Sequence, residues 1–147
     1  MDIIIVNSKS SSFFNLNKYE HHQKAIAVGR AGNVIGGGDW STDRIIPDCV
    51  RAAEKNSVLT LRSPTATRPW QHVLEPISGY LKLAMMLYKE PKKFDGAWNF
   101  GPSSHEIRTV MEVSEAVIGL LGSGEIRVEN NSGGSHEATL LQLNCDK

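Results

Sequence analysis

Short apolar runs alternate along the chain with longer segments in which apolar residues recur every three or four positions. The runs predict strands, the longer segments predict helices, and their alternation predicts an α/β fold. The predicted strands cover 24–31, 57–62, 96–101, 125–129 and 139–144, and the predicted helices cover 43–55, 73–88 and 109–121. Residues 10–23 are mostly polar with three aromatic residues, and 63–69 are rich in turn-forming residues, so both are predicted to be loops, the first a loop or a poorly ordered arm.

Each predicted helix has an apolar stripe that we expect to face a core. The stripes are Ile46, Val50 and Ala53 in the first helix, Ile77, Leu81, Ala84 and Tyr88 in the second, and Val113, Val117 and Leu120 in the third. Thr109 and Glu112 have the spacing of a capping box, and Gly122 is placed to end that helix in a left-handed conformation. Gly79, inside the second helix, costs about 1 kcal/mol relative to alanine, so tertiary packing has to hold that helix.

Composition narrows the classes of function. The 147 residues suit one domain, and 16 basic residues balance 16 acidic ones. This balance argues against nucleic acid or an anionic membrane as partner, and no apolar run is long enough to span a bilayer. The opening "MDIIIVNSK" lacks the features of a signal peptide. Cys49 and Cys145 form no metal or redox motif, so we expect two reduced thiols in a cytoplasmic protein and no metal site.

The glycine-rich segment Arg30 to Trp40, "RAGNVIGGGDW", suggests a phosphate-binding loop but fails both nucleotide motifs. In the phosphate-loop pattern Gly38 stands where lysine is required, and in the dinucleotide pattern Ser41 stands where the last glycine is required. Two readings stay open. The glycines either form a permissive turn, or they let the backbone pass close to a ligand other than a dinucleotide.

Five segments resemble one family in order and spacing: "GRAGNVIGGGDW", "DRIIPD", "RPWQHVLEPISGYL", "WNFGP" and "HEATLLQLNCDK". The chain, over about residues 12–147, resembles the CDP-glucose 4,6-dehydratases, which are extended short-chain dehydrogenase/reductases. The segments "RPWQHVLEP" and "GGGDW" are specific to this family, whereas R-x-x-N-V-x-G is shared with many sugar-nucleotide epimerases and dehydratases.

The resemblance implies a fragment of the extended short-chain dehydrogenase/reductase fold, with the last Rossmann strand and the substrate-binding domain. Residues 1–23 would be an arm left from the Rossmann part, and residues 24–147 a truncated sugar-nucleotide-binding domain. In such enzymes resident NAD oxidises C4 of the sugar, water is lost across C5 and C6, and the hydride returns to C6. The product is a 4-keto-6-deoxy sugar nucleotide of deoxysugar biosynthesis.

The resemblance also implies binding residues for the sugar nucleotide. Asn33 would donate to the diphosphate, Arg68 would clamp the same diphosphate, and Arg44, Ile45 and Ile46 would line the nucleotide pocket. Asn99 and His136 would lie near the same site. Structural alternatives remain for several positions: Asn33 as a turn residue, Arg68 as a surface arginine, Trp70 as a core residue and His72 as a structural histidine. Arg62 and Arg108 receive no role.

The catalytic and NAD-binding segments of the family find no match in this sequence. Lys9 is the candidate for the lysine of the family's Y-x-x-x-K pair, but Ile5 stands in place of the tyrosine. We therefore expect no catalytic residues, no bound NAD, and a chain that is inactive alone.

Two functional alternatives remain open. One is a non-catalytic sugar-nucleotide-binding or purely structural remnant. The other is a related NAD-dependent dehydratase or epimerase with another substrate. Because the strand at 24–31 would lack its sheet neighbours, we expect a homo-oligomer formed through an exposed sheet edge or apolar face.

Overall fold

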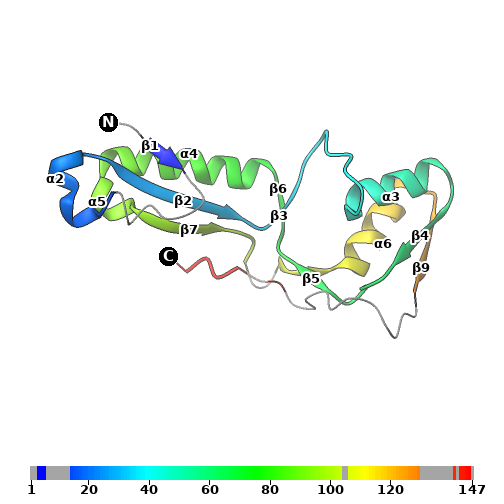
Figure 1. Cartoon of the computed structure of the whole chain (residues 1–147). Coiled ribbons are helices and arrows are strands. Elements are labelled where there is room, and N and C mark those ends of the chain that lie inside the picture. The colour runs from blue at the N-terminus through cyan, green and yellow to red at the C-terminus, as the bar shows by residue number, and fades with distance from the viewer. Residues whose placement is uncertain (1–2, 6–13, 104–105, 130–140, 142, 147) are drawn as a thin grey trace. The chain divides into compact units, whose positions relative to one another are not determined.

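The computed structural model describes residues 3–5, 14–103, 106–129, 141 and 143–146 (Figure 1). The chain forms two compact units: unit 1 comprises 1–34, 71–101 and 143–147, and unit 2 comprises 35–70 and 102–142. The predicted division of the chain at residue 23 does not coincide with the boundary between the units, because unit 1 contains residues from both sides of it. The proposed sugar-nucleotide-binding role of residues 24–147 stays a prediction. No helix in the described part of the chain has the length and apolar character needed to cross a membrane.

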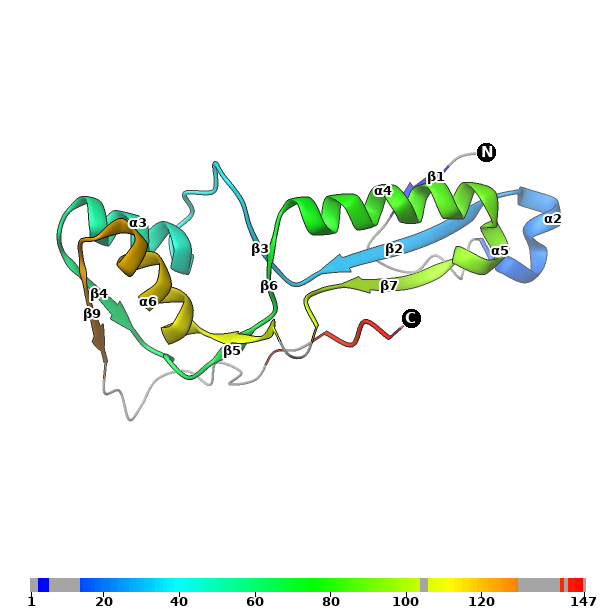
Figure 2. The same ribbon diagram turned by 180° about the vertical axis from the view of Figure 1, so that it is seen from behind.

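Unit 1 is built on a parallel sheet of three strands in the order β1-β2-β7 (Figures 1 and 2). Its elements are β1 (Ile3–Ile5), a 3-10 turn (Leu16–Lys18), α2 (Tyr19–His22), β2 (Ala25–Ala31), α4 (Leu74–Lys89), α5 (Pro91–Phe94) and β7 (Gly96–Phe100). The predicted strand at 24–31 is therefore confirmed as β2. The predicted bare edges of β2 were wrong, because β1 and β7 pair with it on either side. The predicted loop at 10–23 was wrong over its described end, which forms two helical turns.

The core of unit 1 lies between β2 and α4. Ala25 and Ala27 pack against Leu83 and Leu87, with partly buried aromatic residues around them. The predicted stripe of α4 faces solvent instead: Ile77, Leu81 and Tyr88 are 44%, 64% and 64% exposed. Both sides of this helix are apolar, so periodicity could not decide which side the sheet would cover.

Two glycines allow α4 to lie close to the sheet. A Cβ added to Gly29 on β2 would lie 2.7 Å from Cε1 of Tyr80, and one added to Gly79 would lie 2.5 Å from Cε1 of Phe100. The Tyr80 and Phe100 rings themselves meet edge-to-face, with centroids 5.2 Å apart. The close packing of α4 on the sheet therefore requires glycine at position 79. The same packing supplies the tertiary stabilisation that the sequence analysis expected this helix to need.

Unit 2 packs two helices beside a pair of parallel strands. Its elements are α3 (Ile45–Glu54), β4 (Val58–Leu61), β5 (Thr67–Arg68), β8 (Arg108–Thr109), α6 (Val110–Leu121) and β9 (Glu125–Val128). β4 pairs with β9 in parallel, and β5 pairs with β8 antiparallel. β3 (Asn33–Ile35) and β6 (Trp70–His72) form a further pair where the chain passes from one unit to the other.

Most predicted elements of this unit are confirmed, with two differences. The predicted loop at 63–69 contains β5. Of the strand predicted at 139–144, the described residues 141, 143 and 144 form none, and the rest lies outside the described residues.

The two predicted helix stripes of unit 2 are confirmed at Ala53, which is buried, and at Val117, which packs against the core, but they need correction at other positions. Cys49 and Ala52 of α3 pack with Leu59 and Leu61 of β4, whereas the predicted Ile46 and Val50 are only half-buried. On α6 the predicted Leu120 is 88% exposed, and Ser114 is fully buried. Cys49 of α3 and Ser114 of α6 are both fully buried, and the Ser114 hydroxyl donates a hydrogen bond to the Val110 carbonyl at 2.7 Å.

Both cysteines are free thiols, as expected. Burial raises the pKa of Cys49, which therefore stays protonated in the folded protein. Cys145 is exposed.

The predicted capping box of α6 is confirmed. The Thr109 Oγ1 accepts a hydrogen bond from the Glu112 N–H at 3.1 Å, and the Glu112 carboxylate accepts one from the Thr109 N–H at 2.7 Å. Gly122 ends the helix with φ 72°, as predicted. The hydrogen bonds from Thr109 hold the pKa of Glu112 below its usual range.

Thr109→Ala is expected to lower the free energy of unfolding by about 1 kcal/mol, because the Glu112 N–H loses its acceptor and the Glu112 carboxylate loses the Thr109 hydroxyl as a donor. Since the pKa of Glu112 is lower in the folded state, its contribution is complete above the ordinary glutamate pKa and is lost as the pH falls through the lowered value. Urea unfolding of the wild type and Glu112→Gln between pH 7 and pH 3 checks this. An equally steep acid loss in Glu112→Gln would contradict the assignment.

Candidate functional site

In unit 1, two of the predicted binding residues lie at the carboxyl end of the parallel sheet. Asn99 is next to last in β7 and is the register partner of Arg30, while Asn33 follows β2 after one intervening residue. The Gly32 N–H donates to the Phe100 carbonyl at 3.2 Å, which holds these two strand ends together. Ligands of open parallel sheets bind at this edge.

Only one of the two polar atoms in the Asn99 side chain has a hydrogen-bond partner among the described residues. Its Nδ2 donates to the Asn144 carbonyl at 2.6 Å, but its buried Oδ1 accepts no hydrogen bond from any residue that the structure describes. An amide oxygen of this kind can accept a hydrogen bond from a hydroxyl group. Nearby, Gln71 Nε2 donates to the Phe100 carbonyl at 2.9 Å, so Gln71 fixes the end of β7. Sequence reasoning gave Gln71 no role, because only its contact reveals one.

In unit 2, Arg44, Ile45 and Ile46 lie where the glycine-rich loop enters α3. Arg44 is the N-cap residue and provides no side-chain cap, so the amide groups of the first turn are left to other acceptors. Arg44 is exposed, and its charge is one of the causes that lower the pKa of Asp39. Of the glycines in the loop only Gly38, at φ 87°, has a backbone conformation that favours glycine, and a Cβ at Gly37 or Gly38 would meet open space.

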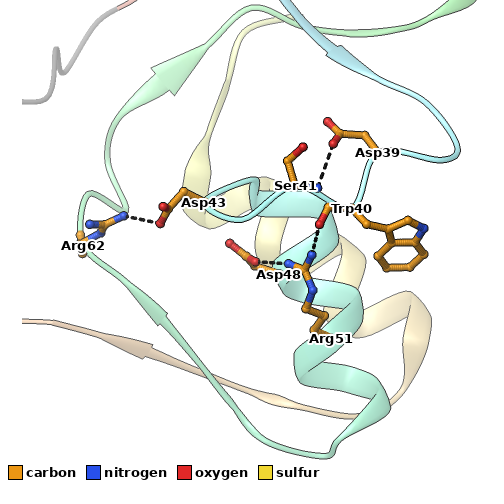
Figure 3. A network of polar contacts seen from close by, with 7 residues as sticks. All are labelled: Asp39, Trp40, Ser41, Asp43, Asp48, Arg51 and Arg62. Atoms are coloured by element: carbon orange, nitrogen blue, oxygen red, sulfur yellow. Dashed lines mark hydrogen bonds and ion pairs between the residues drawn. The ribbon is translucent and has the colours of Figure 1, made fainter.

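A network of polar contacts fixes the loop before Arg44 (Figure 3). The Ser41 N–H donates to the Asp39 carboxylate at 3.0 Å, and this bond holds the pKa of Asp39 below its usual range. Arg51 donates to the Trp40 carbonyl and pairs with Asp48 at 2.6 Å.

A second contact ties the same loop to the residue that follows β4. Asp43, at φ 59°, forms a 3.0 Å ion pair with Arg62. Arg62 received no role from the sequence, and its partner lies 19 positions away, so no local pattern could have revealed the pair.

Arg68 lies in β5, where it is half-buried. Its Nη1 donates to the carbonyl of Thr67, and β5 is held against Arg108 of β8. The Oγ1 of Thr67 is buried and accepts no hydrogen bond from the described residues. Trp70 Nε1 donates to the Arg108 carbonyl at 3.3 Å, so Trp70 and Arg108 both have structural contacts in this unit.

The predicted residues thus divide between the units: Asn33 and Asn99 in unit 1, and Arg44, Ile45, Ile46 and Arg68 in unit 2. Lys9 and His136 lie outside the described residues. His72 is exposed, and its Nδ1 accepts a hydrogen bond from the Leu74 N–H at 3.3 Å, a contact consistent with the structural role considered for it. Among the described residues no three histidine, cysteine or acidic side chains gather as they would around a metal ion.

One Y-x-x-x-K sequence occurs in the chain, at Tyr88–Lys92, but its geometry does not suit catalysis. Tyr88 is in the last turn of α4, and the backbone leaves the helix at Glu90, with φ −133° and ψ 67°. Lys92 in α5 forms an ion pair with Glu20 instead. The two side chains therefore do not share a helix face, as the catalytic pair of the resembled family would.

No family model matches the sequence. Among curated proteins, CDP-glucose 4,6-dehydratase of Salmonella typhimurium is 44% identical over 144 residues, which are 98% of this chain and 40% of the relative. The chain is similar to the C-terminal part of CDP-glucose 4,6-dehydratase. It spans about 40% of the length of that relative, and the resemblance found in the five sequence segments is confirmed.

Solved structures of sugar-nucleotide enzymes have the same fold. A dTDP-glucose 4,6-dehydratase from Bacillus anthracis, solved with NAD, has a TM-score of 0.63 and 22% identity over 97% of this chain and 45% of its own. A UDP-N-acetylglucosamine 4-epimerase from Methanobrevibacter ruminantium, solved with UDP-N-acetylmuramic acid, has a TM-score of 0.66 and 15% identity over 88% of this chain and 40% of its own. The fold is therefore that of part of an extended short-chain dehydrogenase/reductase, like the CDP-glucose 4,6-dehydratase relative.

Proposed function

We propose that this chain forms the sugar-nucleotide-binding part of a CDP-glucose 4,6-dehydratase and that its ligand is CDP-glucose. The observation that carries the proposal is the 44% identity, which extends over 98% of the chain. It is supported by the exposed arginine at the start of α3 and by the amide-bearing carboxyl edge of the unit 1 sheet.

Each proposed contact follows from the chemistry of the side chain. Arg44 and Arg68 carry guanidinium groups, whose paired donors match diphosphate oxygens. Arg44 forms no ion pair with a described residue, although its charge acts on the nearby Asp39 carboxylate, whereas Arg62 is paired with Asp43. The first-turn amides of Ile45 and Ile46 are donors that a cytosine edge can accept from. Asn33 donates to the diphosphate, and the buried Oδ1 of Asn99 accepts from a sugar hydroxyl.

The residues present do not fit NAD, although the B. anthracis relative was solved with it. The chain contains no G-x-G-x-x-G, and the one loop with nearly that spacing has Ser41 in the last position and follows β3 of the two-stranded pair. We therefore propose that the chain alone binds the sugar nucleotide without carrying out dehydration. A binding module of this kind differs from a purely structural remnant, because only the module binds CDP-glucose.

Titration calorimetry tests the proposal directly. CDP-glucose is expected to bind with measurable heat, UDP-glucose more weakly, and NAD not at all. Arg44→Gln is expected to weaken CDP-glucose binding about 10- to 100-fold, as loss of a charge-assisted hydrogen bond should. Arg68→Lys, which keeps the charge but removes the fork, is expected to weaken it about 10-fold.

Arg127→Gln is the matched control, because Arg127 is also an exposed arginine of the same unit and has no proposed contact. Its affinity should equal that of the wild type. Absence of heat from CDP-glucose with a folded chain would overturn the binding proposal and favour the structural remnant. An equal loss in Arg127→Gln and Arg44→Gln would show that the arginine effect is not specific to the site.

A further inference from the structure

Helix α4 presents an apolar stripe to solvent along its full length. Leu74, Ile77, Leu81, Met85 and Tyr88 are between 44% and 64% exposed and recur every three or four residues. At 100° per residue they fall within a band about 80° wide, on the side away from Leu83 and Leu87. A continuous apolar stripe of this kind marks an interaction surface.

The spacing of the stripe is the same in both directions from Leu81. Ile77 and Met85 lie four residues before and after it, and Leu74 and Tyr88 lie seven residues before and after it. Two copies crossing antiparallel at Leu81 would therefore bring Leu81 against Leu81, Ile77 against Met85, and Leu74 against Tyr88. This self-complementary pattern is what a two-fold interface requires.

Charged residues beside the stripe favour the same arrangement. Glu75, Lys82 and Lys89 are all exposed and lie seven residues apart, so they follow one flank of the stripe. In a parallel two-fold pair this flank would lie on opposite sides of the two helices, so the three residues would make no contact with their copies. In an antiparallel pair Glu75 faces Lys89 of the other copy twice, and only Lys82 faces its own copy.

We propose that a second copy of this chain covers the α4 stripe, in an antiparallel helix pair centred on Leu81. Five side chains at this exposure, on the order of 100 Å² each, bury on the order of 1,000 Å² in total. That area lies at the low end of specific interfaces, so the dimer is expected to dissociate in the micromolar range. The proposal does not depend on the ligand of the chain.

Sedimentation velocity between 2 and 200 µM tests the association. The wild type is expected to shift from monomer to dimer, and Leu81→Lys to stay monomeric. Lys89→Glu should weaken the dimer at least 10-fold, and Glu75→Lys combined with Lys89→Glu should restore it. Leu120→Lys is the control, because Leu120 is 88% exposed but lies on α6, outside the stripe. A wild type that stays monomeric at 200 µM would overturn the proposal.

Disulfide trapping tests the orientation, in a Cys145→Ser background that removes the exposed native thiol. Leu81→Cys is expected to form dimers at least 10-fold faster than Leu120→Cys. Leu74→Cys is expected to be slow, because antiparallel copies hold the two positions 74 about 20 Å apart. A mixture of Leu74→Cys and Tyr88→Cys should give the heterodimer rapidly. Rapid linking of Leu74→Cys to itself would mean a parallel pair and overturn the proposed geometry.

Discussion

Gly79→Ala is expected to destabilise the protein, although alanine is the better helix former by about 1 kcal/mol. The added Cβ would lie 2.5 Å from Cε1 of Phe100, well inside van der Waals contact. The Phe100 ring cannot withdraw freely, because it packs against the unit 1 core and meets Tyr80 edge-to-face. Overpacking costs about 1–3 kcal/mol and the helix propensity of alanine offsets about 1 kcal/mol of it, so we expect a net loss of up to about 2 kcal/mol in the free energy of unfolding.

Gly119→Ala provides the control for this prediction. Gly119 also lies inside a helix, α6, but a Cβ there would meet nothing within 4 Å. This variant is expected to gain up to about 1 kcal/mol. Urea unfolding of both variants measures the difference, and Phe100→Leu should recover part of the loss in Gly79→Ala. Equal gains in the two glycine variants would mean that α4 does not approach Phe100 as described.

Leu87→Ala is expected to cost about 2–5 kcal/mol of unfolding free energy, the largest effect of any variant considered. Leu87 is fully buried and packs with Leu83 against the alanines of β2. The small strand residues have no rotatable groups with which to fill the space, so a cavity would remain.

Thermal and urea unfolding of Leu87→Ala against Leu120→Ala measure this effect. Leu120 is the same residue type in a helix, but it is 88% exposed, so its truncation should change the free energy by less than about 0.5 kcal/mol. A loss below about 1 kcal/mol for Leu87→Ala would mean that α4 is not docked on the sheet as described.

The positions of the helices and strands could be predicted from the sequence more accurately than the residues by which each of them faces the core. The capping box at Thr109 and the stop at Gly122 depend on neighbouring residues, so local pattern was sufficient. The buried face of α4 depends on where β2 lies, and the glycine and alanine positions that admit close packing carry no strong hydropathy signal. β5 was missed for a similar reason: its two residues are a strand only because Arg108 and Thr109, about 40 positions later, pair with them.

For the candidate site too, the sequence indicated which residues to consider but not the contacts that each of them makes. Resemblance identified Asn33, Arg44 and Arg68, but their local settings came only from the structure. Arg44 and Arg62 are both arginines near the same loop, and nothing in the sequence indicates that Asp43 neutralises one and leaves the other available. The unsatisfied Oδ1 of Asn99 is likewise a property of packing, since any asparagine on an exposed strand would be hydrated.

The pairing of β2 with β7 has a consequence for biosynthesis. Residue 27 is the register partner of residue 96, and unit 2 residues 35–70 lie between them in the chain. During translation the central strand of unit 1 therefore emerges long before α4 and β7, which cover and pair with it. Ala25, Ile26 and Ala27 remain uncovered during that interval, so the nascent chain has a window in which chaperone binding or aggregation competes with folding.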